Sequence, residues 1–284
     1  MSQILFPSDL SQTSRKAFQF AEAFAKAIQF DLTLLYTYHA EETYYLKRLL
    51  WSSRLKKFAW NKMLIFARTK EKEVPNHVKL RLRKGKLNEH INQAVRRKAY
   101  KMVAYDMDKF NQLFYNQDDQ SFVKPLFRNP ILLSPKNGPF IAPRNILVLD
   151  EDYESINKKI QQEILGLSLK FKANIHYVKA NEQDEWNFKT EHLSRGINLV
   201  QKSVPADILV STLLSYMLEK SIGMVLVGSK GRPFLGELLD SQMFINLNIP
   251  VIYHHYKERV KEEKSLKIKN ILSRDLSGDV LRVG

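Results

Sequence analysis

The chain has 284 residues, with 45 Lys and Arg against 30 Asp and Glu, no Cys, and 44% hydrophobic residues. This composition is typical of a folded protein, and the length suggests about two domains. The absence of cysteine excludes disulfides, thiolate catalysis, iron–sulfur clusters and cysteine-bound zinc. The N-terminus lacks a signal-peptide pattern and no apolar run reaches the ~18 residues of a membrane span, so we expect a cytoplasmic protein without a membrane partner.

Short apolar runs alternate with helical patterns along the first half of the chain. A strand is predicted at 4–9, and a helix follows because apolar residues recur every three or four positions from Ala17 to Ile28. The other predicted elements of this half are a strand at 31–38, a helical region at 41–72, a strand at 78–82, a helix at 87–99, and strands at 101–105 and 130–133.

The second half repeats this order. Its predicted strands are 146–150, 174–178, 207–211, 224–228 and 250–253, and its predicted helices lie near 156–167, 182–203 and 212–221. Alternating strands and helices indicate right-handed βαβ units and hence parallel sheets covered on both faces. We therefore predict an α/β protein with two doubly wound, Rossmann-like domains in tandem, at 1–140 and 141–256, and a charged tail at 257–284.

A glycine-containing loop is the segment with the clearest chemical pattern. The strand at 224–228 runs through Gly-Ser-Lys-Gly-Arg at 228–232 towards a helix. Backbone N–H groups in such a loop, together with a helix N-terminus, suit a phosphate, and Lys230 and Arg232 add positive charge. The spacing is neither the dinucleotide fingerprint nor the P-loop, so a tight turn without a ligand stays open as the alternative.

These features resemble the universal stress protein family in its tandem two-domain form, over about residues 3–255. The resemblance rests on the run ending in Pro7-Ser8-Asp9, the strand at 32–38, and the Val-Gly-Ser-Lys-Gly-Arg segment with its Pro-Val-Ile closing strand. ATP-binding members carry a glycine, two residues, a glycine, nine residues, and then Gly followed by Ser or Thr. Gly228 and Gly231 match the two glycines, whereas Ser241 and Gln242 stand at the last two positions.

The resemblance implies a non-catalytic, nucleotide-responsive stress protein that binds ATP or a related adenine nucleotide in its second domain. The residues that would form this site are Asp150, Gly228, Ser229, Lys230, Gly231, Arg232 and Ser241. The loop would supply N–H groups and positive charge, Ser241 would close the site, and Asp150 would meet the nucleoside. For Asp150 a helix N-cap is an equal alternative, and for Asp9, which we match to it, capping is favoured.

Family members also pair through their closing strands. The resemblance therefore implies an internal pseudo-dimer, in which 130–133 lies against 250–253, or an oligomer of whole chains such as a dimer. No nucleophile stands at a recognisable spacing from a base, and none of the 7 histidines has a zinc-binding spacing, so we expect neither an enzyme nor a metal site.

The first domain departs from the family at its own loop. Aligning 102–103 with 224–225 places Asp106 at the position of Gly228, Asp108 at that of Lys230, and Lys109 at that of Gly231. Two carboxylates would repel phosphates, so we infer that this domain has lost its nucleotide site. A divalent-metal site at the two carboxylates is the alternative, but a solvated loop is favoured.

All of the excess positive charge lies in residues 47–101, which hold 18 Lys and Arg against 3 Asp and Glu. We favour a solvated basic face, with the aromatic residues of 51–66 mostly in the core. The strand at 78–83 alternates basic and apolar residues, which suits a charged sheet edge. The alternative is a polyanion or nucleic-acid site, or an interaction scaffold, because basic residues interleaved with aromatics bind backbones and stack bases.

Overall fold

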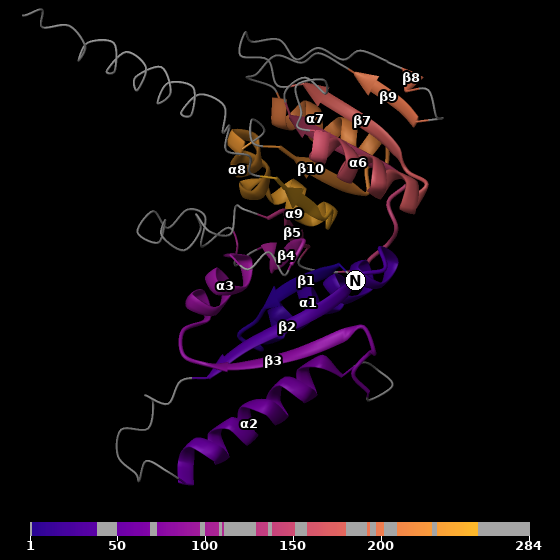
Figure 1. The fold of residues 1–284 in the computed structure, drawn as a ribbon. Coiled ribbons are helices and arrows are strands. Elements are labelled where there is room, and N and C mark those ends of the chain that lie inside the picture. The colour runs from indigo at the N-terminus through magenta and orange to yellow at the C-terminus, as the bar shows by residue number, and fades with distance from the viewer. Residues whose placement is uncertain are drawn as a thin grey trace, which may run out of the picture.

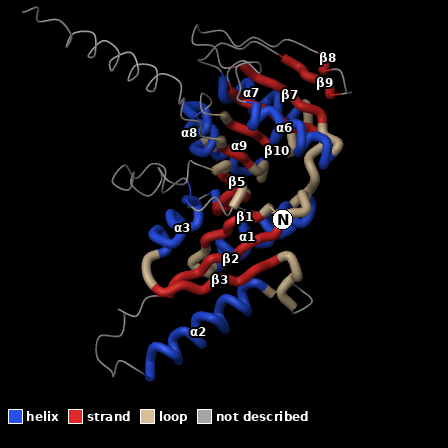
Figure 2. Tube along the Cα trace, viewed as in Figure 1, coloured by secondary structure: helices blue, strands red, loops and turns tan. Residues whose placement is uncertain are grey.

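The computed structural model of the protein describes residues 2–38, 50–68, 73–96, 100–107, 110, 129–135, 138–150, 158–179, 192–193, 197–201, 209–228 and 232–254. Within these residues, one sheet of 11 strands carries helices on both of its faces (Figure 1, Figure 2). The predicted α/β class is therefore confirmed. The charged tail predicted at 257–284 lies outside the described residues.

The elements of the first half agree with those predicted from the sequence. Its strands are β1 (Gln3–Pro7), β2 (Asp31–Tyr38), β3 (Val78–Lys84), β4 (Met102–Asp106) and β5 (Ile131–Ser134), and its helices are α1 (Gln12–Ala27), α2 (Leu50–Ala67) and α3 (Leu87–Arg96). The helical region predicted at 41–72 is helical at 50–67, and the rest of it, apart from residue 68, lies outside the described residues.

The second half agrees except near its third strand. Its strands are β6 (Asn145–Asp150), β7 (Asn174–Lys179), β8 (His192–Leu193), β9 (Ile197–Gln201), β10 (Met224–Val227) and β11 (Val251–Tyr253), and its helices are α6 (Lys158–Phe171), α7 (Leu209–Glu219), α8 (Arg232–Asp240) and α9 (Gln242–Leu247). The helix predicted at 182–203 is wrong at 197–201, which pairs with β7 as β9. The strand predicted at 207–211 is wrong from Leu209, where α7 begins.

The order of the strands repeats from the centre of the sheet outward. It is β3-β2-β1-β4-β5-β11-β10-β6-β7-β9-β8, so β5-β4-β1-β2-β3 is mirrored by β11-β10-β6-β7-β9. All neighbours are parallel except β8 with β9 and β5 with β11 at the centre. There Leu132 pairs with Ile252, which confirms within one chain the predicted pairing of the closing strands. The domain boundaries at 1–140 and 141–256 stay a prediction.

The core forms two layers, one on each face of the sheet, and both layers run through both halves. Along β1, Leu5 lies in one layer, and Ile4 and Phe6 lie in the other. α1, α2 and α6 contribute to the layer of Ile4, whereas α3, α7, α8 and α9 contribute to that of Leu5. Strands buried on both faces are apolar at successive positions, which is why such short runs were recognisable in the sequence.

An aromatic cluster joins the two halves on the α1 face. Phe140, in the segment between β5 and β6, lies with its ring centroid 5.4 Å from that of Phe20, 5.6 Å from Phe24 and 5.8 Å from Phe171. Two of these rings belong to α1 and one to α6. The ammonium of Lys170 also donates to the carbonyl of Ile28, so the first helix of each half is held against the other.

Candidate functional site

The predicted glycine loop begins where two neighbouring parallel strands of the second half end. β10 ends at Val227, next to the end of β6. Gly228 is buried, and its N–H donates to the carbonyl oxygen of Leu149 at 2.8 Å. α8 then begins at Arg232, so the predicted strand and the helix that follows it are confirmed. Residues 229–231 and the side chains of Asp150 and Arg232 lie outside the described part of the structure.

Hydrophobic packing fixes the helices that follow the loop. Leu235, Leu238 and Leu239 of α8 lie in the same core layer as Val225 and Val227 of β10. These residues of α8 are almost fully buried. The start of α8 is therefore held at the carboxyl end of β10, where ligand crevices of doubly wound sheets lie.

Ser241 connects α8 to α9. Its N–H donates to the carbonyl oxygens of Glu237 and Leu238, both at 3.1 Å, and its Oγ accepts from the N–H of Phe244 at 3.4 Å as the N-cap of α9. The backbone N–H of Ser241 is thus used within the protein, but its hydroxyl hydrogen is not needed for the cap. The side chain of Gln242 lies along α9, where its Nε2 donates to Asn246 at 3.1 Å.

Strand register refines the match between the two halves. Ile4 pairs with the first residue of β4, and Ile146 pairs with the first residue of β10, so these two isoleucines are equivalent. Four residues later, Asp150 is level with Ser8 and not with Asp9. The match between Asp9 and Asp150 in the sequence is therefore displaced by one residue.

Asp9 has a capping role at the start of α1. Its Oδ1 accepts from the N–H of Ser11 and from the hydroxyl of Ser14, both at 2.9 Å. Ser11 is the N-cap of α1 and accepts from the N–H of Ser14 at 3.3 Å. The favoured interpretation of Asp9 as a capping residue is confirmed.

Asp106 of the first half is the structural equivalent of Gly228. It ends β4, four residues after Met102 as Gly228 is four residues after Met224, and its side chain is buried. The predicted alignment of the two loops is thus confirmed at this residue, whereas Asp108 and Lys109 lie outside the described residues. Among the residues that the structure describes, no group of three His, Asp or Glu side chains gathers as metal ligands would.

Comparison with known proteins agrees with the resemblance seen in the sequence. Residues 1–105 match the model of the family described as "Universal stress protein family". This first part of the chain is therefore similar to the universal stress protein family. A search of curated proteins finds no match to the chain.

One solved structure supports the α/β fold. A universal stress protein from Archaeoglobus fulgidus DSM 4304 superposes with a TM-score of 0.57 at 12% identity, covering 90% of this chain and 97% of that chain. A functionally unknown protein from Pseudomonas aeruginosa PAO1 has a TM-score of 0.44 at 13% identity, covering 96% of this chain and 98% of that chain. At such low identity, the first likeness shows the fold alone.

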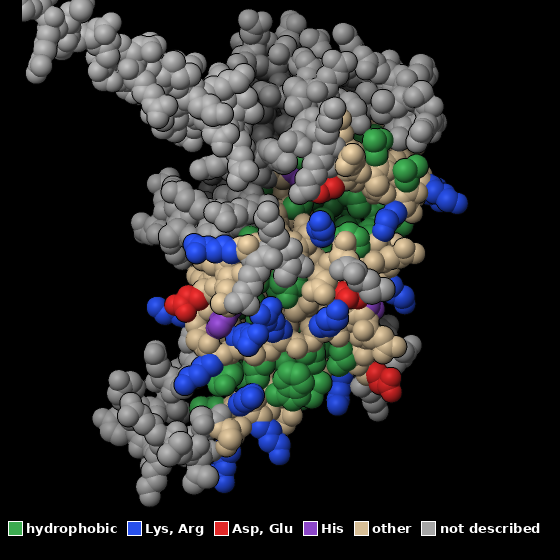
Figure 3. All heavy atoms as spheres, viewed as in Figure 1, with side chains coloured by type: hydrophobic (Ala, Val, Ile, Leu, Met, Phe, Trp, Pro, Cys, Tyr) green, Lys and Arg blue, Asp and Glu red, His purple; other side chains and the backbone are tan. Residues whose placement is uncertain are grey.

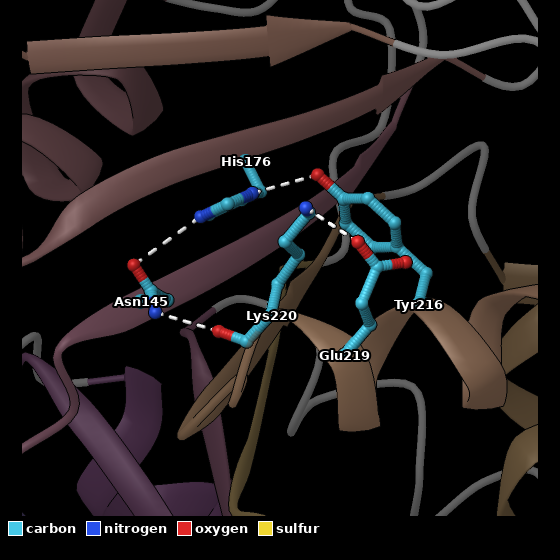
Figure 4. Close-up of polar contacts among 5 residues, drawn as sticks. All are labelled: Asn145, His176, Tyr216, Glu219 and Lys220. Carbon is cyan, nitrogen blue, oxygen red and sulfur yellow. Dashed lines mark hydrogen bonds and ion pairs between the residues drawn. The ribbon is translucent and has the colours of Figure 1, made fainter.

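A polar network lies at the opposite, amino-terminal ends of β6 and β7 (Figure 4). His176 Nε2 lies 3.3 Å from Asn145 Oδ1, an acceptor, so Nε2 carries the hydrogen and Nδ1 accepts from the Tyr216 hydroxyl at 2.7 Å. Asn145 in turn donates to the carbonyl of Lys220 at 2.6 Å, at the end of α7. No sequence pattern indicates this network, because its members are 31 to 75 residues apart.

The stability of the protein should fall on acidification because of His176. Burial, reinforced by the charge of Lys220, lowers the pKa of His176 below 6.5, and burial next to Glu219 raises the pKa of Tyr216 to about 12. The unfolded chain therefore takes up the histidine proton at a higher pH than the folded chain, so this contribution is present above about pH 6.5 and is lost as the pH falls below it. Chemical unfolding should show a smaller loss between about pH 7.5 and 5.5 for His176→Gln than for the wild type. Equal losses would show that His176 does not titrate on unfolding.

Proposed function

We propose that this protein acts as a universal stress protein that binds ATP or a related adenine nucleotide, without catalysing a reaction, at the carboxyl ends of β6 and β10. The observation that carries the proposal is the junction at Gly228. Its buried backbone is bonded to Leu149 of β6, and a helix anchored by three buried leucines begins four residues later. This is the strand–loop–helix arrangement in which backbone N–H groups and a helix N-terminus receive phosphates.

Each residue of the proposed site has a role that follows from its chemistry. Residues 229–231 and the first turn of α8 would supply N–H donors, and Lys230 and Arg232 would offset the phosphate charge. Ser241 keeps a hydroxyl hydrogen to donate while its oxygen caps α9. Asp150 would accept from the ribose or the adenine amino group, because a carboxylate has only acceptors.

The residues of the first half support the proposal of a single nucleotide site in each chain. Asp106 is buried at the position where the second half has the bare backbone of Gly228. A carboxylate there would face the phosphates with like charge at low dielectric constant, which costs more than it would in water. We therefore propose one nucleotide per chain, bound in the second half.

The proposal is tested by identifying the small molecules that the purified full-length chain releases on denaturation. Denaturation should release an adenine nucleotide, identified by chromatography and mass, or the nucleotide-free protein should take one up. A chain that releases none, and that shows no binding of ATP, ADP or AMP, would contradict the proposed function.

A further inference from the structure

α2 lies at one end of the molecule, beyond the sheet edge formed by β3 (Figure 1). Its inner face packs on the sheet through the buried side chains Ala59, Met63, Phe66 and Ala67. Two of these are alanines, which allow the helix to lie close to the strands. The side of α2 that faces away from the sheet has no covering element among the described residues.

Two large apolar side chains project from this uncovered side. Phe58 is 60% exposed and Ile65 is 59% exposed, whereas Trp60, which is 40% exposed, lies about 200° around the helix axis from Phe58, on another side of the helix. Phe58 and Ile65 are seven residues apart, so they lie on the same side of the helix two turns from each other. The expectation that the aromatic residues of this segment are mostly core is therefore wrong for Phe58 and Trp60. The side of α2 that packs against the sheet is instead the one that carries Ala59 and Met63.

Cations surround these apolar side chains. The exposed basic residues of the segment are Arg54, Lys56, Lys57, Lys62 and Arg68. Lys62 places its ammonium 5.2 Å from the centroid of the Phe58 ring. α2 contains no Asp or Glu, and none of the ion pairs within the described part of the chain includes these five cations. Hydrophobic side chains flanked by Lys and Arg are visible at the lower end of Figure 3.

The remaining cations of the basic stretch belong to a different face. β3 is an edge strand that alternates as predicted, with Leu80 and Leu82 packed against the α1 and α2 layer. Lys79 is bound to Asp31 at 2.6 Å, and Arg81 donates to the hydroxyl of Tyr100, a residue of the opposite layer. The charge of 47–101 is thus divided between two faces, and the α2 face combines it with exposed apolar area.

We propose that the outer face of α2, formed by Arg54, Lys57, Phe58, Lys62 and Ile65, binds the surface of an anionic lipid membrane. Cations contact lipid phosphates, while Phe58 and Ile65 enter the boundary between headgroups and acyl chains. No described helix is long and apolar enough to cross a bilayer, so α2 lies on the membrane surface. The sequence-based expectation of no membrane partner rested on spanning segments, which surface binding does not need.

Charge and chemistry favour an anionic membrane over a second copy of the chain or a single-stranded nucleic acid. A second copy of the chain would bring a second cationic face, and like charges repel. Single-stranded nucleic acids bind in basic grooves and stack bases on aromatic rings, whereas Ile65 has no π-face and α2 presents the outside of a helix. A lipid surface matches aliphatic, aromatic and cationic side chains at once.

Vesicle cosedimentation of the full-length chain tests the proposal. We expect binding to vesicles of phosphatidylcholine and phosphatidylglycerol in equal parts, and little binding to phosphatidylcholine alone. Phe58→Ser with Ile65→Ser should weaken the binding about tenfold or more, because it removes the inserted side chains but not the charge. The matched control is Leu169→Ser with Leu218→Ser, which changes side chains that are 67% and 50% exposed on α6 and α7 and should leave binding unchanged.

Further arms separate lipid from other anions. Arg54→Gln with Lys57→Gln should also weaken vesicle binding, because it removes charges that contact the lipid phosphates. Thermal unfolding checks that each variant is folded. The proposal is overturned if the chain does not bind anionic vesicles, if the Phe58 and Ile65 variant binds like the wild type, or if single-stranded poly(U) binds more tightly than vesicles through the same residues.

Discussion

Replacing Ile252 by Ala lowers the free energy of unfolding by about 2–5 kcal/mol. Ile252 is fully buried in β11 and pairs with Leu132 of β5, which is also fully buried in the same core layer. The substitution removes packing where the two half-sheets meet, and a sheet with helices on both faces has little room to collapse into the cavity. Denaturant unfolding followed by circular dichroism measures the change.

A double-mutant cycle separates the junction from ordinary core packing. Leu132→Ala and Ile252→Ala should be non-additive by about 0.5 kcal/mol or more, because the two side chains are neighbours across the antiparallel pair. Leu218→Ala, at a half-exposed position of α7, serves as the control and should change stability by less than about 0.5 kcal/mol. Full additivity of the two junction variants would argue against the pairing of β5 with β11.

Gly228→Asp combined with Gly231→Lys should weaken adenine-nucleotide binding about 100-fold or more, because a carboxylate then faces the phosphates at low dielectric constant. The change copies the residues of the first half into the second. The protein already holds Asp106 at the equivalent place, where its side chain is only 6% exposed, so the fold has a precedent for this carboxylate. Equilibrium titration with ATP measures the loss.

Two further variants make this result interpretable. Asp106→Asn is the matched control, since it alters the equivalent position of the half that we propose to be empty, and it should leave binding unchanged. Lys230→Gln removes loop charge without changing the backbone, and it should weaken binding about tenfold even if the glycine variant is unstable. Unaltered binding in both the glycine variant and Lys230→Gln would place the nucleotide elsewhere.

Much of the fold was predictable because strands buried on two faces leave short, continuous apolar runs. The run at 31–38 became β2 with the same bounds. The strand predicted at 207–211 was wrong, because this short apolar run contains the start of α7. Periodicity cannot separate a buried strand from a buried helix over so few residues, and the buried positions Leu213, Leu214 and Met217 show the helical spacing only beyond that run.

The site was predictable in its backbone and less so in its side chains. The order of strand, glycine and helix at 228–232 follows from local sequence, whereas the capping role of Ser241 was not predicted. The equivalence of Asp150 to Ser8 follows from the pairing of β6 with β10, and this register cannot be read from the sequence. Likewise, the exposure of Phe58 depends on which stripe of α2 meets the sheet, and that is decided by packing.

The measurement that tests the central claim most directly is calorimetric titration of ATP into the nucleotide-free, full-length protein. We predict one site per chain, unchanged by Asp106→Asn and lost with Gly228→Asp and Gly231→Lys. No heat of binding for any adenine nucleotide, or two equivalent sites per chain, would contradict the account.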